Sequence, residues 1–304
     1  MEPNTNRPQR VAVVTGANKG IGLETVRQLA SHGVTVVLTA RDAKRGSDAA
    51  SKLHQMGFPN VIFHQLDVLD PVSIQNLAEF LKGKFGKLDI LVNNAAASGV
   101  EVDEQRLRDM NIEVDTWLSG KAVNLVQDVM KHTYEKAEEC LNTNYYAVKN
   151  LTESLLPLLQ LSDSGARIVN VTSLRGELWR IRSDDLRKEF AEVESLSEEK
   201  LDEILKRFLH DFKENKLEAG GWSLMLPSYS VSKVTLNAYT RMLARRHPNM
   251  KINCVHPGYV NTDLNWHTGP MPVEEGARGS VKCALLPNDG PTGCYFDQTE
   301  VASF

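Results

Sequence analysis

A glycine-rich turn near the start of the chain joins a short apolar run to a segment with helical spacing. The run VAVV at 11–14 is typical of a buried strand, and the turn TGANKGIG that follows has glycines at positions 16, 20 and 22. The next segment, residues 22–33, reads as a helix that ends at Gly33. A strand, a glycine turn and a helix in this order direct backbone N–H groups and the positive end of a helix dipole at one point. The unit therefore predicts an anion site, and a dinucleotide pyrophosphate is the anion that fits it best.

Apolar runs and helical segments continue to alternate through most of the chain. Further strands are predicted at 34–40, 61–68, 88–94, 166–173 and 251–258. Further helices are predicted at 42–57, 71–85, 138–159 and 230–246. Near-continuous apolar strands joined by helical crossovers indicate a parallel sheet that is covered on both faces. We therefore expect an α/β fold of the Rossmann type, a doubly wound parallel sheet with helices on both faces. It would form one domain over residues 10–304, behind a flexible tail of residues 1–9.

A long charged segment, about residues 175–226, does not fit this alternation. Apolar residues recur in it at helical spacing from Leu201 to Phe212, which predicts an amphipathic helix. Polar and glycine signals flank this helix on both sides: a possible capping box of Ser195 with Glu198, and a possible stop at Gly220 and Gly221. We expect a helical insertion that either packs on the surface or forms a flap near the substrate pocket.

The composition excludes several classes of partner. The chain has 304 residues, of which 35 are basic and 39 acidic, and no Lys/Arg cluster favours nucleic acid or an anionic membrane as a partner. Its four cysteines are too far apart for a CxxC pair and too few for a disulfide framework, so no metal site is predicted. No signal-peptide core and no run of transmembrane length is present in the sequence. A cytoplasmic protein with a small-molecule partner is the expectation.

The end of the second predicted strand distinguishes the two nicotinamide dinucleotides. An acidic residue at this position would bind a ribose 2′-hydroxyl, whereas a basic residue would bind a 2′-phosphate. The strand runs into Arg41, and Lys19 adds a second cation in the glycine turn, which favours NADP(H). Asp42 is the competing observation, but it is better placed as the N-cap of the following helix.

The pattern Tyr-x-x-x-Lys bears on catalysis and occurs twice. Carbonyl reduction needs a hydride and a proton donor, and a tyrosine can donate the proton when nearby positive charge lowers its pKa. A lysine four residues later supplies such a charge on the same helix face. The two copies are Tyr145 with Lys149 and Tyr229 with Lys233. Only the second follows a strand that ends in a hydroxyl residue, Ser173, at the sheet edge where such folds bind ligands.

Several motifs together resemble the short-chain dehydrogenase/reductase family, in the order and approximate spacing of that family. They are TGANKGIG, LDILVNNA, VNVTS, YSVSK and HPGYVNTDL. The resemblance extends from about Arg10 almost to the C-terminus and is closest to the carbonyl-reductase branch, among plant reductases of the salutaridine and menthone/neomenthol type. In that branch a segment inserted before the catalytic tyrosine covers the surface that other members use to oligomerise. The resemblance therefore implies a monomer.

The resemblance also assigns roles to individual residues. Tyr229 would be the general acid, and Ser173 would position the substrate carbonyl. Lys233 would lower the tyrosine pKa and hold the nicotinamide ribose, and Asn144 would anchor a water against the lysine. The implied cofactor-binding residues are Gly16, Asn18, Lys19, Gly20, Ile21, Gly22, Arg41, Asp67, Val68, Asn94, Tyr229, Lys233, Pro257, Gly258, Val260 and Thr262. Asp67 would contact the adenine, although a capping role in a turn is the alternative.

Two positions depart from the family pattern, since Ala96 and Ala147 stand where glycines are expected. Neither change removes a catalytic group. The implied activity is NADPH-dependent reduction of a ketone on a small hydrophobic cyclic substrate, of the monoterpenoid or alkaloid kind.

Two other functions stay open at this point, an enone double-bond reductase and an NADP(H)-binding protein without catalysis. The retained pair of Tyr229 and Lys233 argues against both. Several aromatic residues are expected either in an apolar pocket wall or in the core, namely Trp117, Trp179, Trp222 and Trp266.

Overall fold

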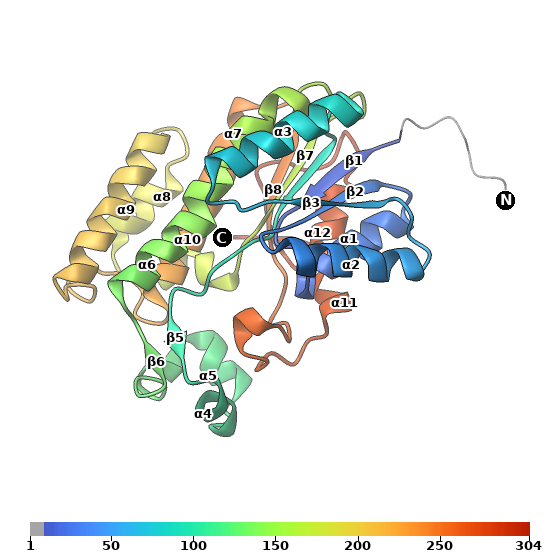
Figure 1. Cartoon of the computed structure of the whole chain (residues 1–304). Helices are drawn as coiled ribbons and strands as arrows, with labels where there is room; N and C mark the ends of the chain where they lie inside the picture. The colour runs from blue at the N-terminus through green and yellow to red at the C-terminus, as the bar shows by residue number, and fades with distance from the viewer. Residues whose placement is uncertain (1–8) are drawn as a thin grey trace.

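The computed structural model describes residues 9–304 and has an eight-stranded, mostly parallel sheet at its centre (Figure 1). The strand order is β10-β9-β8-β7-β4-β1-β2-β3, with β10 antiparallel to its neighbour β9. The strands are β1 (Val11–Val14), β2 (Thr35–Ala40), β3 (Val61–Gln65), β4 (Ile90–Asn93), β7 (Arg167–Val171), β8 (Lys251–His256), β9 (Tyr295–Asp297) and β10 (Glu300–Ala302). The expected parallel sheet is thus confirmed, and it gains two short edge strands that the sequence did not predict.

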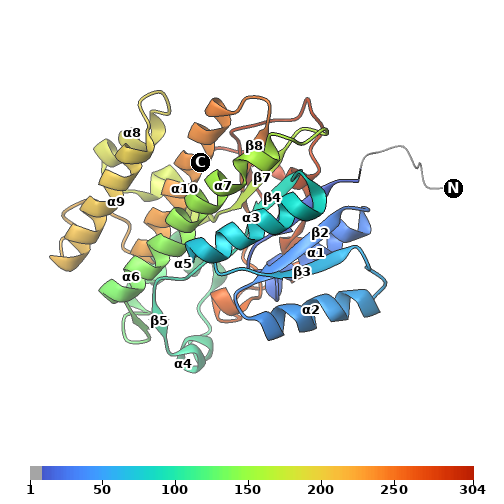
Figure 2. The ribbon, with the colours of Figure 1, turned by 45° about the horizontal axis from the view of Figure 1, so that its top comes forward.

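Helices cover both faces of this sheet (Figures 1 and 2). One face carries α3 (Pro71–Phe85), α7 (Ala147–Leu159) and α10 (Pro227–Arg246), and the other carries α1 (Gly20–Ser31), α2 (Ala43–Gln55) and α12 (Arg278–Ala284). Strand β1 shows why both faces close: Val11 and Val13 lie in the first core, and Ala12 and Val14 in the second. This is the doubly wound Rossmann-type fold that the sequence predicts.

The order in which successive strands are added to the sheet reverses between β1 and β4, which pair with each other. The chain proceeds outward from β1 to β2 and β3 on one side, and from β4 to β7 and β8 on the other. Connections from the carboxyl ends of β1 and β4 leave on opposite faces, and ligands of doubly wound folds bind in the crevice that this creates. The glycine turn after β1 and Asn94 after β4 meet at this point.

Two helices differ in detail from the prediction. The segment predicted as one helix at 138–159 contains α6 (Tyr134–Leu141), a π-helical turn at Asn142–Tyr146, and α7. The helix predicted from Ser230 begins earlier, because Pro227 fills the first helical position after Leu226 in the left-handed conformation (φ 51). Tyr229 therefore lies inside the first turn of α10, one turn before Lys233.

The insertion contains α8 (Asp184–Ala191) and α9 (Glu198–Lys213), which pack against α6 and α10 beside the main body (Figures 1 and 2). The amphipathic helix is confirmed, but its predicted ends were wrong. The N-cap is Ser197, which accepts from the N–H of Lys200, rather than Ser195. Leu196 before the cap and Leu201 after it are buried in one cluster, a hydrophobic staple that sets this start.

The C-terminal end of α9 also lies elsewhere than at the predicted glycine pair, Gly220 and Gly221. The helix ends at Lys213, and Asn215 takes the left-handed conformation (φ 53) two residues later. Asparagine tolerates this conformation better than most residues, so it ends a helix much as glycine does.

A small unit below the sheet in Figure 1 was not predicted. It contains the hairpin of β5 (Glu101–Val102) and β6 (Met130–Lys131) with two short helices, α4 (Glu104–Asp109) and α5 (Val114–Ser119). Most of the predicted tail, residues 1–8, lies outside the described part of the chain, whereas Gln9 donates a 2.6 Å hydrogen bond to Thr35. Across residues 9–304 no helix has both the length and the apolar character needed to cross a membrane.

Candidate active site

A groove of about 590 Å³ lies at the crevice between β1 and β4. Most of the predicted cofactor-binding residues line it: Gly16, Asn18, Lys19, Gly20, Ile21, Gly22, Arg41, Asp67, Val68, Asn94 and Thr262. Asp67 also accepts a hydrogen bond from the backbone N–H of Leu69 at 3.0 Å, so its carboxylate caps a turn while it lines the groove. The structure thus brings these predicted residues together from five separate segments, which follow β1, β2, β3, β4 and β8.

The glycine turn fits closely against the loop after β4. A Cβ at Gly16, whose φ is +61, would lie 3.0 Å from the Cα of Ala95, and a Cβ at Gly22 would lie 2.4 Å from Nδ2 of Asn94. Asn94 Nδ2 donates to the carbonyl oxygen of Thr15 at 2.8 Å, and Thr15 Oγ1 accepts from the backbone N–H of Asn94 at 2.9 Å. A Cβ at either position would collide with this loop or with the turn itself, so the glycines let the turn pack closely here. The backbone of the turn then forms a cradle along the groove that suits a phosphate group.

Three cations line this groove, and they differ in their partners. Lys19 pairs with Asp263, and Arg45 pairs with Asp42 at 3.1 Å. Arg41, at the end of β2, is exposed and forms no ion pair within residues 9–304. Asp42 caps α2 by accepting from the N–H of Arg45 at 2.8 Å, which confirms the capping role that the sequence suggested. A free guanidinium beside the cradle fits a 2′-phosphate.

Arg45 is a groove residue that the sequence analysis missed. Its position four residues after Arg41, one helical turn into α2, is the signal that could have revealed it.

A second, smaller cavity of about 90 Å³ adjoins the groove and shares Ile21, Asn94 and Thr262 with it. The remaining predicted residues that line it are Ser173, Tyr229, Lys233, Pro257 and Gly258. Val260 lines neither cavity, because its side chain is fully buried. No group of three His, Cys, Asp or Glu side chains that could hold a metal occurs in residues 9–304.

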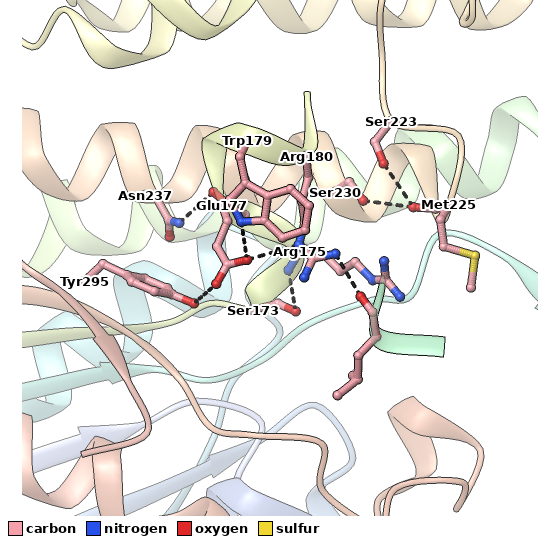
Figure 3. A network of polar contacts seen from close by, with 12 residues as sticks. Ser173, Arg175, Glu177, Trp179, Arg180, Ser223, Met225, Ser230, Asn237 and Tyr295 are labelled. Carbon is pink, nitrogen blue, oxygen red and sulfur yellow. Dashed lines mark hydrogen bonds and ion pairs between the residues drawn. The ribbon is translucent and has the colours of Figure 1, made fainter. Parts of the chain in front are cut away.

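The Tyr229 phenol is half-buried in this second cavity, which we call the catalytic cavity because the predicted catalytic residues Ser173, Tyr229 and Lys233 line it. Burial, and secondarily the nearby Cys140 thiol, raise the pKa of Tyr229, whereas a hydrogen bond with Ser173 and the charge of Arg175 lower it. Ser173 follows β7 and caps a short 3₁₀ helix, η3 (Leu174–Gly176), where its hydroxyl also accepts from the N–H of Arg175 at 3.2 Å (Figure 3). A phenol and a serine hydroxyl therefore face one point, as the proton donor and the second donor to a carbonyl oxygen would.

Lys233 lies one helical turn after Tyr229 and is almost completely buried. Its Nζ lies 5.4 Å from the centre of the Tyr229 ring and donates to the carbonyl oxygen of Val171 at 2.9 Å. Burial lowers the pKa of Lys233 to about 8, with the Cys140 thiol acting in the opposite direction. The ammonium group has no carboxylate partner in residues 9–304, so its charge is not neutralised locally.

Asn144 lies in the π-helical turn and holds the loop after β4. Its Oδ1 accepts from the N–H of Ala97 at 2.8 Å, and its Nδ2 donates to the Ala97 carbonyl oxygen at 3.0 Å. The same Nδ2 donates to Ser232 Oγ at 3.0 Å, next to Lys233. The extra residue of a π turn re-aims one side chain of an otherwise regular helix. Here it places the Asn144 amide between the loop after β4 and helix α10.

Aromatic side chains cover the outer side of the catalytic cavity. Trp117 from α5 lines it, stacks on Tyr259 at 6.3 Å between ring centres, and meets Trp266 edge-on at 6.2 Å. Trp179 and Trp222 do not line this cavity. Trp179 is 62% exposed, and Trp222 is buried against Phe208 of the insertion.

Arg175 and His256 complete the lining and were not predicted. Both are buried, at 5% and 7% exposure, and no periodic pattern points to either of them. His256 is the first residue of the motif HPGYVNTDL and directly precedes the predicted Pro257, which was the available signal.

A phosphate cradle at the switch point of a doubly wound sheet, joined to a cavity with a tyrosine, a lysine and a serine, defines an oxidoreductase that uses a nicotinamide dinucleotide. The chain belongs to the short-chain dehydrogenase family, whose pattern matches residues 10–182. Both the fold and this match make it an enzyme of the oxidoreductase class.

Relatives of known name match almost the whole chain. It is 52% identical to short-chain dehydrogenase/reductase 1 of Saponaria officinalis, over 97% of this chain and 96% of that protein. It is 47% identical to salutaridine reductase of Papaver bracteatum, over 99% and 98% of the two chains. The solved structure of a menthone neomenthol reductase from Mentha piperita superposes with a TM-score of 0.84, at 42% identity, over 97% of this chain and 100% of that one.

Proposed function

We propose that this protein reduces a ketone on a small, hydrophobic cyclic substrate to the alcohol, with NADPH as the hydride source. The single observation that carries this proposal is the arrangement of Tyr229, Ser173 and Lys233 around the cavity that adjoins the phosphate cradle. Similarity to a salutaridine reductase and to a menthone neomenthol reductase supports a cyclic ketone of the alkaloid or monoterpenoid kind.

The chain's own residues act on the carbonyl oxygen. When bound in the groove, a reduced nicotinamide would supply the hydride for the carbonyl carbon. Ser173 donates a hydrogen bond to the carbonyl oxygen and thereby orients it, and Tyr229 transfers its phenolic proton to that oxygen, which completes the alcohol. The phenolate that remains is stabilised by the positive charges of Lys233 and Arg175 and is reprotonated from solvent. Asn144 keeps the helix of Lys233 in place relative to Ala97.

The cofactor would be held by the cradle and by the cations at its far end. Gly16, Gly20 and Gly22 leave room for the pyrophosphate at the start of α1. Arg41, which forms no ion pair in residues 9–304, would bind the 2′-phosphate together with Lys19. This is the reason to prefer NADPH over NADH.

Two properties expected from the sequence belong to the same proposal. We expect a monomer, because α8 and α9 cover the outer faces of α6 and α10, and light scattering on the purified protein measures this directly. We also expect a cytoplasmic protein.

The test is oxidation of NADPH and of NADH by a panel of cyclic ketones and conjugated enones, with identification of the products. We expect alcohols as products and a clear preference for NADPH. Arg41→Ala should reduce that preference by roughly tenfold, since one charge-assisted contact is lost. Lys44→Ala is the matched control, because Lys44 pairs with Asp48 outside the groove. Saturated ketones as the only products would show a double-bond reductase, and cofactor binding without turnover would show a protein that only binds NADP(H).

A further inference from the structure

The catalytic cavity contains a buried guanidinium whose hydrogen-bond donors the reaction scheme does not use. Arg175 lies in η3, two residues after Ser173, and only 5% of its surface is exposed. Its side chain lines the cavity beside Tyr229, and each of the two groups shifts the pKa of the other. Burial lowers the pKa of Arg175 to about 10, so the guanidinium remains charged at neutral pH.

This guanidinium lacks a counter-ion. Within residues 9–304 it makes one hydrogen bond, to the carbonyl oxygen of Trp117 at 2.5 Å, although a guanidinium has five N–H donors. Glu177 is the acidic side chain whose charge acts on Arg175, and both of its oxygens are already engaged with other partners (Figure 3). Its Oε2 accepts from Trp179 Nε1 at 2.9 Å and from Arg180 Nε at 3.1 Å, and its Oε1 accepts from the Tyr295 hydroxyl at 3.3 Å.

A second polar group without a partner lines the same cavity. His256 is 7% exposed, and its Nδ1 is buried with no hydrogen-bond partner. Burial lowers the pKa of His256 to about 4, so the ring is neutral at physiological pH and can donate or accept one hydrogen bond at each nitrogen. His256 ends β8 and Arg175 follows β7, so both come from the carboxyl edge of the sheet.

Such groups are costly to bury without partners, and an arginine charge is the costliest of them. Within residues 9–304 the lining contains no acidic side chain that could pair with the guanidinium, and one part of it is an apolar and aromatic wall: Trp117, Leu118, Leu174, Leu226, Tyr259 and Leu264. A cavity that combines this apolar wall with an unpaired guanidinium and an imidazole suits a molecule that is apolar and carries a polar group.

We propose that Arg175, with His256 beside it, binds a second oxygen group of the substrate, separate from the reacting carbonyl. The group that meets this need best is a carboxylate, since it forms charge-assisted and bidentate hydrogen bonds with a guanidinium. The substrate class is then a cyclic ketone that carries a carboxylate on its ring system. This inference rests on the proposed ketone reduction and specifies its substrate.

The alternative role of Arg175 is structural: its bond to the Trp117 carbonyl would only tie α5 to η3. The two roles predict different effects of an Arg175 substitution on the selectivity among ketones. Loss of a tie lowers the rate with every ketone by the same factor, whereas loss of a carboxylate contact lowers the rate selectively.

The experiment compares matched ketones in the full-length enzyme. The probes are 3- and 4-oxocyclohexanecarboxylate against 3- and 4-isopropylcyclohexanone, which have similar shape but no charge. At whichever ring position reacts faster, we expect wild type to have a higher kcat/KM for the carboxylate than for the uncharged ketone. Arg175→Met should reduce the ratio of kcat/KM for the carboxylate to kcat/KM for the uncharged ketone by roughly tenfold to a hundredfold. Arg175→Lys should restore part of the ratio. Arg182→Met, an exposed arginine that pairs with Glu218 at 3.1 Å, is the control and should leave the ratio unchanged.

A binding measurement separates this inference from the proposed function. Calorimetry with cyclohexanecarboxylate, which cannot be reduced, should show binding to wild type with NADP⁺ present and a loss of at least tenfold in Arg175→Met. That binding result supports the carboxylate contact even if none of the ketones is reduced. A failure to reduce any ketone would count against the proposed reaction only. Equal ratios in wild type and Arg175→Met, or binding of cyclohexanecarboxylate that does not depend on Arg175, would overturn it.

Discussion

The two Tyr-x-x-x-Lys pairs have the same spacing and opposite surroundings. Tyr145 is completely buried, and its hydroxyl has no hydrogen-bond partner. Lys149 lies 5.6 Å from the centre of that ring, but its Nζ also lies 3.3 Å from Asp202 and 3.8 Å from Glu198 of α9. Burial, followed by the charge of Asp202, raises the pKa of Tyr145 far above its ordinary value.

Within residues 9–304 the second pair has no carboxylate that forms an ion pair with its lysine. Lys233 donates to the Val171 carbonyl, and the Tyr229 phenol faces the cavity next to Ser173 and Arg175. The comparison shows that the partners of the lysine decide the role of the pair. A lysine that pairs with two carboxylates anchors the insertion, whereas a lysine without one keeps its charge available to the tyrosine.

Replacement of each tyrosine gives the largest expected contrast. Tyr229→Phe removes the proton donor and should lower kcat for ketone reduction by about a thousandfold, within the usual contribution of a general acid. Tyr145→Phe should change kcat by less than about twofold, because that hydroxyl is buried outside the cavity. Steady-state rates with a cyclic ketone and NADPH measure both. A comparable loss in the two variants would remove the distinction between the pairs.

The pH profile tests the charge on Lys233. With a pKa of about 8, this lysine is protonated below that value and neutral above it. Because its positive charge stabilises the phenolate that forms on Tyr229, kcat/KM for reduction should fall about tenfold per pH unit above roughly pH 8. Lys233→Arg remains charged and should extend the plateau to higher pH, even if the plateau itself is lower. Identical alkaline limbs in wild type and Lys233→Arg would assign the titration to another group.

Lys149, the lysine of the other pair, should contribute to stability and not to catalysis. Lys149→Met removes the half-buried cation that pairs with Asp202 and Glu198, although Glu198 keeps its ion pair with Arg246. The change should lower the free energy of unfolding by about 1 kcal/mol. Urea melts measure this change, and kcat should stay near the wild-type value. Arg207→Met is a matched control, since Arg207 pairs with Glu189 on the more exposed side of α9. A loss of activity without a loss of stability would contradict the anchoring role.

The smallest effect concerns the buried hydroxyl of Tyr145. Since that hydroxyl has no partner, Tyr145→Phe should keep the free energy of unfolding or raise it by up to about 1 kcal/mol. The same urea melts decide this. A clear destabilisation would mean that the hydroxyl is hydrogen-bonded, for example through a water.

The cofactor end of the molecule could be predicted from the sequence because it depends on local rules. Gly16, Gly20 and Gly22 lie within one strand-turn-helix unit, so their spacing alone specifies the cradle. Asp42 precedes α2 and caps it as a short polar side chain at that position should.

The substrate end could not be predicted in the same way, because it depends on which distant segments meet. Arg175 and Trp117 are far apart in the chain and meet only because α5 folds over η3. Nothing in the sequence separates Trp179, which is exposed, from Trp222, which packs on Phe208. The start of α9 at Ser197 likewise follows from the burial of Leu196 and Leu201.

The most direct test of ketone reduction against double-bond reduction uses NADPH that carries deuterium at the transferred position. A cyclic enone and its saturated ketone are incubated with the enzyme, and the labelled carbon in each product is located by NMR. Our account predicts deuterium on the carbinol carbon of an alcohol, with any double bond intact. Deuterium on the β-carbon of a retained ketone would contradict it and would make the protein a double-bond reductase.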